Sequence, residues 1–185
     1  MSDSIQSIQQ LSSFFFASDV RGMKTAYDEL TDIFPAPTVD DWSAVEFSFN
    51  RLFVGPRALL APPYASIYLD RDNTRLMGEA TLQIRQFYGM LGLVSPWLNK
   101  IPDDHIALEL DALWQIETAL LEKDSPQLRD MHEYLVNRLQ TWAPKFCARI
   151  QSIDDVHPAI IHIAKTLEQV LSTSLLTTTP QSAEN

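Results

Sequence analysis

Apolar residues recur at helical spacing along most of the chain, and the longest uninterrupted pattern runs from Ile101 to Leu121. Ile106, Leu110 and Leu113 fall on one face of a helix in this segment. A second apolar face of the same helix is formed by Leu108, Ala112, Ile116 and Ala119. Because a helix that is apolar on two faces has to be covered on both, the pattern predicts that this helix is central to the fold.

Polar groups cluster at the N-terminal end of this predicted helix. Pro102 suits its first turn, where a missing N–H costs nothing, and Asp103 and Asp104 stand where the positive end of the helix dipole favours carboxylates. His105 and Glu109 lie four residues apart on one face. A carboxylate at that spacing can hold the imidazole.

The same apolar spacing predicts further helices before and after the central one. They cover approximately residues 5–15, 19–34, 38–55, 74–92, 125–143, 144–153 and 158–171. Candidate N-caps are Ser18 or Asp19, Thr38, Thr74 and Ser125, the last of them followed by a proline at the first helical position. Pro144 predicts that one helix ends and a new one starts there.

The segment from Val54 to Asn73 contains three prolines, a glycine and no sustained helical period. A loop of this length is uncommon in a compact domain unless it has a task of its own. Tyr64, Ser66 and Tyr68 alternate with apolar residues here, so in an extended segment the two phenols and the hydroxyl share one face. In a helical segment the two tyrosines instead stack four residues apart.

Hydrophobic residues make up 45% of the 185 residues, which is enough to fill one sizeable core. Few glycines and many helix-forming residues favour helices over sheets. We therefore expect an all-α fold, a compact single-domain helical bundle with a long proline-rich loop between helices three and four. Residues 1–172 form the predicted domain, and residues 173–185, rich in serine and threonine, form a predicted disordered tail.

The formal net charge of −10 repels nucleic acid and anionic lipid over most of the surface, so we expect a basic partner and no nucleic acid. Cys147 is the single cysteine, which suits a reducing compartment. The N-terminal residues do not resemble a secretory signal, and no apolar run approaches the roughly 20 residues that a membrane span needs. The expected location is cytoplasmic, without stable membrane insertion.

Motifs for nucleotide, metal and serine-hydrolase chemistry are absent from the sequence. The four histidines lack the spacing of metal ligands, so neither a metal nor a cofactor is expected. The group Asp104, His105 and Glu109 is compatible with an acid–base pair, with an acidic spot for a cationic ligand, or with plain capping and packing at a helix start. Tyr64 and Tyr68 form either a recognition surface or ordinary loop packing.

Three sequence blocks resemble a known family in both order and spacing. They are NRLFVGP at 50–56, APPYASIYLD at 61–70 and PDDHIALEL at 102–110. Together they resemble the TorD/DmsD/NarJ group of molybdoenzyme maturation chaperones. TWAPKF at 141–146 and VHPAI at 156–160 resemble the C-terminal pattern of that group. The resemblance implies an all-helical cytoplasmic chaperone that binds the apo-form of an exported molybdopterin oxidoreductase and its twin-arginine signal peptide until the cofactor is in place.

The resemblance also implies where the peptide binds. The residues matching the peptide-binding motifs of the family are Pro62, Pro63, Tyr64, Ser66, Tyr68, Asp104 and His105. Two adjacent guanidinium groups followed by an apolar segment need carboxylates beside an aromatic and proline-lined groove, and Glu109 adds a further carboxylate. These residues meet only if the loop folds over the helix start. Arg57 stands where some relatives carry an aromatic ring.

Two other functions remain as alternatives. One is a small helical hydrolase or nucleotide-binding protein that uses His105 and Glu109, and the other is a helical adaptor without a molybdoenzyme client. Relatives of the resembled family can exchange helices between protomers, so the expected state is a monomer or a domain-swapped dimer.

Overall fold

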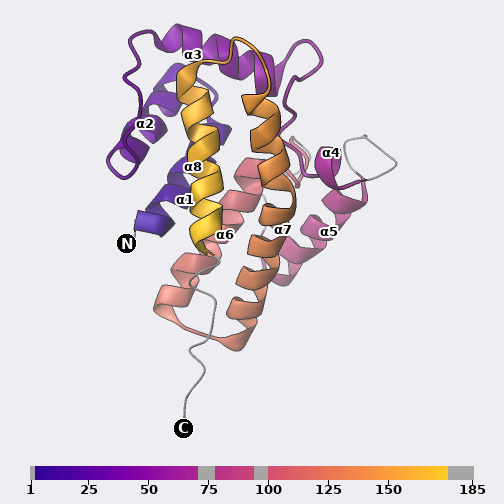
Figure 1. The fold of residues 1–185 in the computed structure, drawn as a ribbon. Coiled ribbons are helices and arrows are strands. Elements are labelled where there is room, and N and C mark those ends of the chain that lie inside the picture. The colour runs from indigo at the N-terminus through magenta and orange to yellow at the C-terminus, as the bar shows by residue number, and fades with distance from the viewer. Residues whose placement is uncertain (1–2, 71–77, 94–99, 175–185) are drawn as a thin grey trace.

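The computed structural model describes residues 3–70, 78–93 and 100–174, and these residues form an all-α bundle (Figure 1). Its helices are α1 (Asp3–Phe16), α2 (Val20–Thr31), α3 (Trp42–Phe49), the π-helical turn η1 (Asn50–Val54), α4 (Ser66–Leu69), α5 (Glu79–Met90), α6 (Ile106–Glu122), α7 (Pro126–Gln151) and α8 (Pro158–Ser174). Within the described residues the extended pairing is limited to one antiparallel bridge, between Tyr64 and His105. The predicted all-α fold class is confirmed. The proline-rich loop after the third helix is shorter than predicted, because η1 includes Val54 and α4 begins at Ser66.

The predicted central helix, α6, packs against α1 and α7. Ile106, Leu110 and Leu113 are completely buried, as the apolar pattern predicted. The hydroxyl of Ser12 on α1 also donates to the carbonyl of Ala107, at 2.9 Å, so the contact with α1 includes a buried hydrogen bond. The central position of α6 is therefore confirmed.

The longest described helix is α7, and it runs unbroken through Pro144. The predicted helix start at Pro144 was therefore wrong. A proline inside a helix removes a backbone hydrogen bond and costs about 3 kcal/mol. Trp142 and Phe146, on either side of it, are completely buried. Burying such side chains contributes about 1.5–3 kcal/mol each, so packing in the core offsets the cost of the proline.

Two predicted N-caps are confirmed by their hydrogen bonds. The Asp19 carboxylate accepts from the backbone N–H of Gly22 at 2.8 Å and opens α2. The Ser125 hydroxyl accepts from the N–H of Leu128 at 3.2 Å and opens α7. Both caps satisfy N–H groups that a helix start otherwise leaves unpaired.

The predicted cap Thr38 was wrong, because the third helix begins later. Asp41 caps it by accepting from the N–H of Ser43 at 2.9 Å. The predicted cap Thr74 lies outside the described residues. In the structure, Gly78 is the N-cap of α5.

The last helix, α8, opens behind His157, whose Nδ1 accepts from the N–H of Ala159 at 3.2 Å. It continues to Ser174, two residues beyond the predicted end of the domain. The rest of the predicted tail, residues 175–185, lies outside the described residues.

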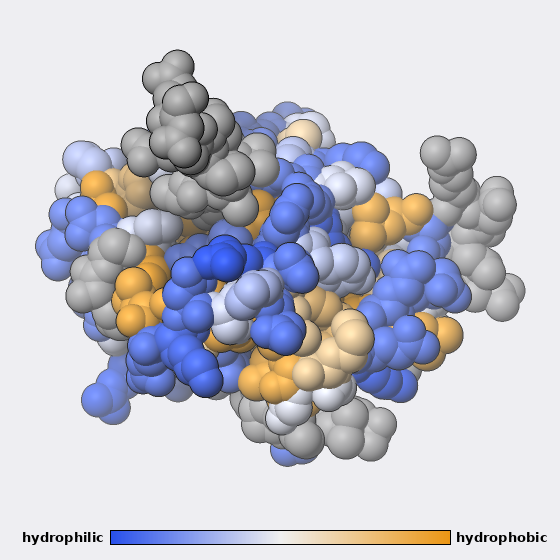
Figure 2. Space-filling view, turned by 90° about the horizontal axis from the view of Figure 1, so that it is seen from below, coloured by the Kyte–Doolittle hydropathy of each residue, from blue (hydrophilic) through white to orange (hydrophobic). Residues whose placement is uncertain are grey.

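Aromatic rings fill much of the core on the α1 side. The rings of Phe14, Phe15, Phe49 and Phe53 meet edge to face, with centroids 5.0–5.9 Å apart. Polar residues cover most of the face shown in Figure 2, with apolar residues scattered among them. Among the described residues, none of the helices has the length and apolar character needed to cross a membrane.

Candidate functional site

The proline-rich loop folds over the start of α6. The N–H of Ala65 donates to the carbonyl of Asp104, and the N–H of Ile106 donates to the carbonyl of Pro63, both at 2.9 Å. These two bonds form the bridge between Tyr64 and His105. A helix start leaves its first N–H groups without intrahelical partners, and here the loop supplies one of the missing acceptors.

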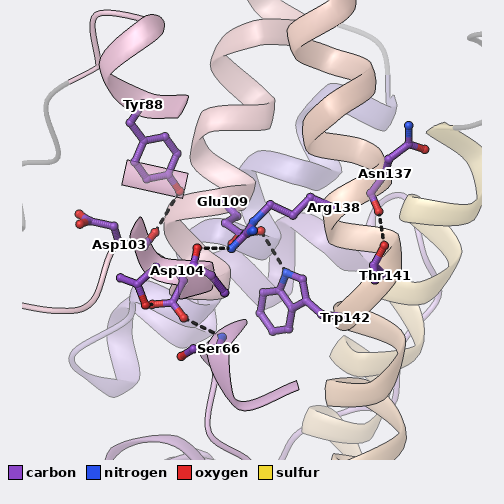
Figure 3. A network of polar contacts seen from close by, with 11 residues as sticks. Ser66, Tyr88, Asp103, Asp104, Glu109, Asn137, Arg138, Thr141 and Trp142 are labelled. Atoms are coloured by element: carbon purple, nitrogen blue, oxygen red, sulfur yellow. Dashed lines mark hydrogen bonds and ion pairs between the residues drawn. The ribbon is translucent and has the colours of Figure 1, made fainter. Parts of the chain in front are cut away.

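Asp104 connects the loop, α5 and the start of α6 through its side chain. Its Oδ2 accepts from the N–H of Ser66 at 2.8 Å, and its Oδ1 accepts from the hydroxyl of Thr81 at 2.9 Å (Figure 3). The side chain is completely buried. Its two oxygens are therefore engaged inside the protein, where they hold the loop in place.

Asp103 attaches the same turn to α5 by different contacts. Its carboxylate accepts from Arg85 Nε at 2.5 Å, and its backbone carbonyl accepts from the buried hydroxyl of Tyr88 at 3.1 Å. The turn before α6 is thus fixed on two sides, by the loop and by α5.

His105 is the N-cap of α6, so the predicted helix start at Pro102 was four residues too early. The Nδ1 of His105 accepts from the N–H of Ala107 at 3.1 Å. Its ring packs between those of Phe16 and Tyr64, with centroids 6.0 and 5.2 Å away. Burial lowers the pKa of His105 to about 4, even though the neighbouring Asp104 raises it. The imidazole is therefore neutral at pH 7.

Glu109 faces α7, away from His105. Its Oε1 accepts from Arg138 Nε at 2.9 Å, and its Oε2 accepts from the indole N–H of Trp142 at 3.0 Å (Figure 3). Arg138 also donates to the carbonyl of Ala80 on α5, at 2.9 Å. The predicted carboxylate–imidazole pair is therefore replaced by a buried ion pair between α6 and α7.

Burial raises the pKa of Glu109 to about 7, while Arg138 and the hydrogen bond from Trp142 oppose the rise. Burial alone would lower the pKa of Arg138, but the Glu109 carboxylate raises it above the usual value. Each of the two charged groups is buried, and each depends on the other to offset the cost of its desolvation. Since Glu109 is enclosed and His105 uses Nδ1 as a cap, the two do not form the acid–base pair that the hydrolase alternative requires.

Arg138 and Trp142 are polar partners that the sequence analysis did not identify. A signal for Arg138 was available, because it falls on the apolar face of α7, between Leu135 and Trp142 at helical spacing. An arginine on the buried face of an amphipathic helix indicates a buried acceptor.

The loop residues 66–69 form one helical turn, which excludes the extended alternative for this stretch. Tyr64 packs on His105, whereas Tyr68 stacks on Trp142 with centroids 5.8 Å apart and donates its hydroxyl to the carbonyl of Pro62 at 2.9 Å. Burial raises the pKa of both phenols. The predicted stacking of the two tyrosines on each other was therefore wrong, because Tyr64 lies before the helical turn and the two rings pack against different parts of the bundle.

The predicted site residues divide into two sets by burial. Pro62, Tyr64 and Tyr68 are half-buried and reach the surface. The others are buried beneath them: Pro63, Ser66, Asp104, His105 and Glu109. In the part of the chain that the structure describes, no three carboxylate, histidine or cysteine side chains are grouped so that they could hold a metal ion.

Comparison with known proteins gives the same picture as the motifs. The sequence model of the family described as nitrate reductase delta subunit matches residues 17–148. The chain is 34% identical over 100 residues to the Tat proofreading chaperone DmsD of Salmonella typhi, a match covering 54% of this chain and 45% of the relative. It is 32% identical over 148 residues to the chaperone protein TorD of Psychrobacter sp. (strain PRwf-1), covering 76% and 65%. The chain thus spans about half the length of several curated relatives that it matches.

A crystal structure from Archaeoglobus fulgidus, named as a proposed redox enzyme maturation protein, has the same fold. The two superpose with a TM-score of 0.63 over 90% of this chain and 93% of the other, at 19% sequence identity. Because the family model covers most of the chain and the named relatives are TorD and DmsD chaperones, this chain belongs to the nitrate reductase delta subunit family, in the TorD/DmsD/NarJ group that its motifs resembled.

Proposed function

We propose that this chain is a cytoplasmic maturation chaperone, and not an enzyme, that binds the apo-form of an exported molybdopterin oxidoreductase together with its twin-arginine signal peptide. The chaperone relatives and the order of the three motif blocks support this proposal. Holding the client until its cofactor is inserted requires specific binding and no cofactor in the chaperone itself.

The observation that carries the proposal is the loop fixed over the start of α6. It presents the edges of Pro62, Tyr64 and Tyr68 at the surface of an otherwise buried layer. Aromatic and proline edges can bury the apolar segment that follows the arginines of such a peptide. The inner residues Pro63, Ser66, Asp104, His105 and Glu109 act in this proposal by positioning the loop.

The arginine pair requires a carboxylate that a peptide can reach at the surface. Asp104 and Glu109 do not offer this, because both side chains are completely buried and hydrogen-bonded inside the protein. Asp70 is the C-cap of α4 and is half-buried, so part of its side chain reaches the surface, while its Oδ2 is buried without a hydrogen-bond partner. We assign the first guanidinium contact to Asp70, a residue that the sequence analysis did not single out.

A titration with two synthetic peptides tests the function. One peptide carries two adjacent arginines followed by about a dozen apolar residues, and the other carries two lysines instead, with the same charge but without the bidentate geometry of guanidinium. The chaperone should bind the arginine peptide about tenfold more tightly, since a charge-assisted hydrogen bond contributes about 1.5–3 kcal/mol. Equal affinity for the two peptides would overturn the proposal.

Asp70→Asn should remove the preference for arginine. The matched control is Asp130→Asn, which changes an exposed carboxylate on α7. If Asp70→Asn and the control behave alike, the carboxylate assignment fails while the chaperone function stands.

A further inference from the structure

A hollow of about 730 Å³ lies beside the proposed peptide surface, where the end of α3 and η1 meet the first part of the loop. We call it the arginine groove. Its lining consists of Phe47, Asn50, Arg51, Gly55, Pro56, Arg57, Ala58 and Leu60. None of the predicted site residues is among them.

Large apolar side chains at this groove are exposed to solvent. Phe47 is 72% exposed and Leu60 is 38% exposed, although most large apolar residues of the described chain are buried. Apolar residues gathered around a hollow are typical of a surface that a partner covers.

The charge of the groove is opposite to that of the protein as a whole. Its lining contains two arginines and no acidic residue, in a chain with a net charge of −10. Arg57 is exposed and has no hydrogen bond or ion pair with any described residue. Arg149 extends the positive charge, since its Nε donates to the carbonyl of Leu60 at 2.5 Å.

Arg51 is likewise not paired with a carboxylate among the described residues. Its guanidinium donates to the backbone carbonyls of Asp154 and Asp155, at 3.0 and 2.9 Å. Its Nε is buried without a hydrogen-bond partner. Because this N–H is buried, Arg51 contributes positive charge to the groove and not a free hydrogen-bond donor.

We propose that the arginine groove binds an extended peptide segment in which apolar side chains stand next to a carboxylate. The apolar residues would cover Phe47 and Leu60, and the carboxylate would pair with Arg57. The side-chain amide of Asn50 offers a donor and an acceptor for the peptide backbone. The segment belongs to the client protein, so this inference rests on the proposed function.

The segment is not the arginine pair of the signal peptide, because Arg51 and Arg57 repel adjacent guanidinium groups. The client would therefore contact the chaperone at two surfaces, one that binds its arginine pair and one that binds a carboxylate. An anionic membrane is disfavoured by the net charge of −10 and by the concave shape of the groove.

Three peptides of equal length and apolar content test the proposal: one with two glutamates, one with two glutamines and one with two lysines at the same positions. The parent protein should bind the glutamate peptide at least tenfold more tightly than the glutamine peptide, and the difference should shrink at high salt. Arg57→Glu should abolish that difference and favour the lysine peptide. Arg21→Glu, which makes the same charge change at an exposed position of α2, should leave all three affinities within about twofold of the parent.

Equal binding of the glutamate and glutamine peptides would overturn the proposal, as would an effect of Arg21→Glu as large as that of Arg57→Glu. Binding to phosphatidylglycerol vesicles that Arg57→Glu abolishes, without any peptide binding, would overturn it in favour of a membrane surface. Self-association that Arg57→Glu abolishes, again without peptide binding, would overturn it in favour of a second copy of the chain.

The twin-arginine peptide is titrated in parallel, so that the two proposals fail separately. If the parent protein binds the arginine and lysine signal peptides equally but still prefers the glutamate peptide, only the proposed function is overturned. The opposite pattern would overturn only the arginine groove. Arg57 lies in an exposed loop segment, and an unchanged thermal melting curve verifies that Arg57→Glu is folded.

Discussion

Charged residues of this protein occupy two contrasting environments, the buried layer under the loop and the open arginine groove beside it. In the buried layer Glu109 has a cation and an indole N–H as partners, and Asp104 has two hydrogen-bond donors. In the groove Arg57 has no partner among the described residues, and Arg51 bonds only backbone carbonyls. Buried charges that are already paired are costly to separate, whereas an exposed unpaired charge remains available to a ligand.

The contrast predicts that the largest loss of stability follows from breaking the buried pair. Arg138→Ala leaves the Glu109 carboxylate in the core without its cation, which should cost about 3–5 kcal/mol of unfolding free energy. Urea denaturation measures it. The control is Arg129→Ala, which removes the exposed pair with Asp124 and should cost less than about 1 kcal/mol. Similar midpoints for the two variants would show that the buried pair does not stabilise the fold.

The second largest loss of stability should follow from shortening a buried apolar side chain of the core. Leu113→Ala in α6 should cost about 2–5 kcal/mol, because it leaves a cavity where a completely buried leucine stood. Leu121→Ala on the same helix, where the leucine is 66% exposed, is the control and should have little effect. An unchanged denaturation midpoint for Leu113→Ala would contradict the central position of α6.

Two buried groups should impose opposite pH dependences on stability. Folding raises the pKa of Glu109 from 4.5 to about 7, so its contribution is present below pH 4.5 and is lost as the pH rises through 7. Folding lowers the pKa of His105 from 6.5 to about 4, so its contribution is present above pH 6.5 and is lost as the pH falls through 4. The two effects should largely cancel in the parent protein between pH 4.5 and 6.5.

Single substitutions should uncover each effect. His105→Asn keeps a capping side chain but removes the titration, so stability should then fall as the pH rises from 4.5 to 7. Glu109→Gln should give the reverse slope, with stability falling on acidification below 6.5. Thermal melting across this pH range measures both, and parallel curves for the two variants would contradict the assignment.

The smallest expected effect on stability comes from a local cap. Ser125→Ala removes the acceptor for the N–H of Leu128 and should cost about 0.5–2 kcal/mol. Ser125→Asp retains an acceptor at the same position and should restore the parent stability. If alanine and aspartate at this position give the same melting temperature, the hydrogen bond seen at the start of α7 contributes nothing.

The features that the sequence predicted are those governed by neighbouring residues. Ser125 and Asp19 were recognised as caps because a cap acts within one turn of its own helix. The continuity of α7 through Pro144 was missed because distant packing of Trp142 and Phe146 outweighs a local preference.

The candidate site shows the same limit. The motif blocks identified the loop and the start of α6 as partners, but not which charges were free. Glu109 is paired with Arg138, which lies on another helix 29 residues along the chain, so the sequence around Glu109 contains no sign of its partner. Whether Arg57 is unpaired and whether Asp104 is hydrogen-bonded likewise depend on which distant residues the fold brings next to them.

The central claim, that the loop over α6 binds a twin-arginine peptide, is tested most directly by the affinity of that peptide for Tyr64→Ala. Tyr64 is half-buried against His105, and Tyr134, exposed on α7 against Phe87, is the matched control. Tyr64→Ala should weaken the peptide about tenfold with little dependence on salt, while Tyr134→Ala and Arg57→Glu should not weaken it. Unchanged affinity in Tyr64→Ala, or an equal loss in Tyr134→Ala, would contradict the account.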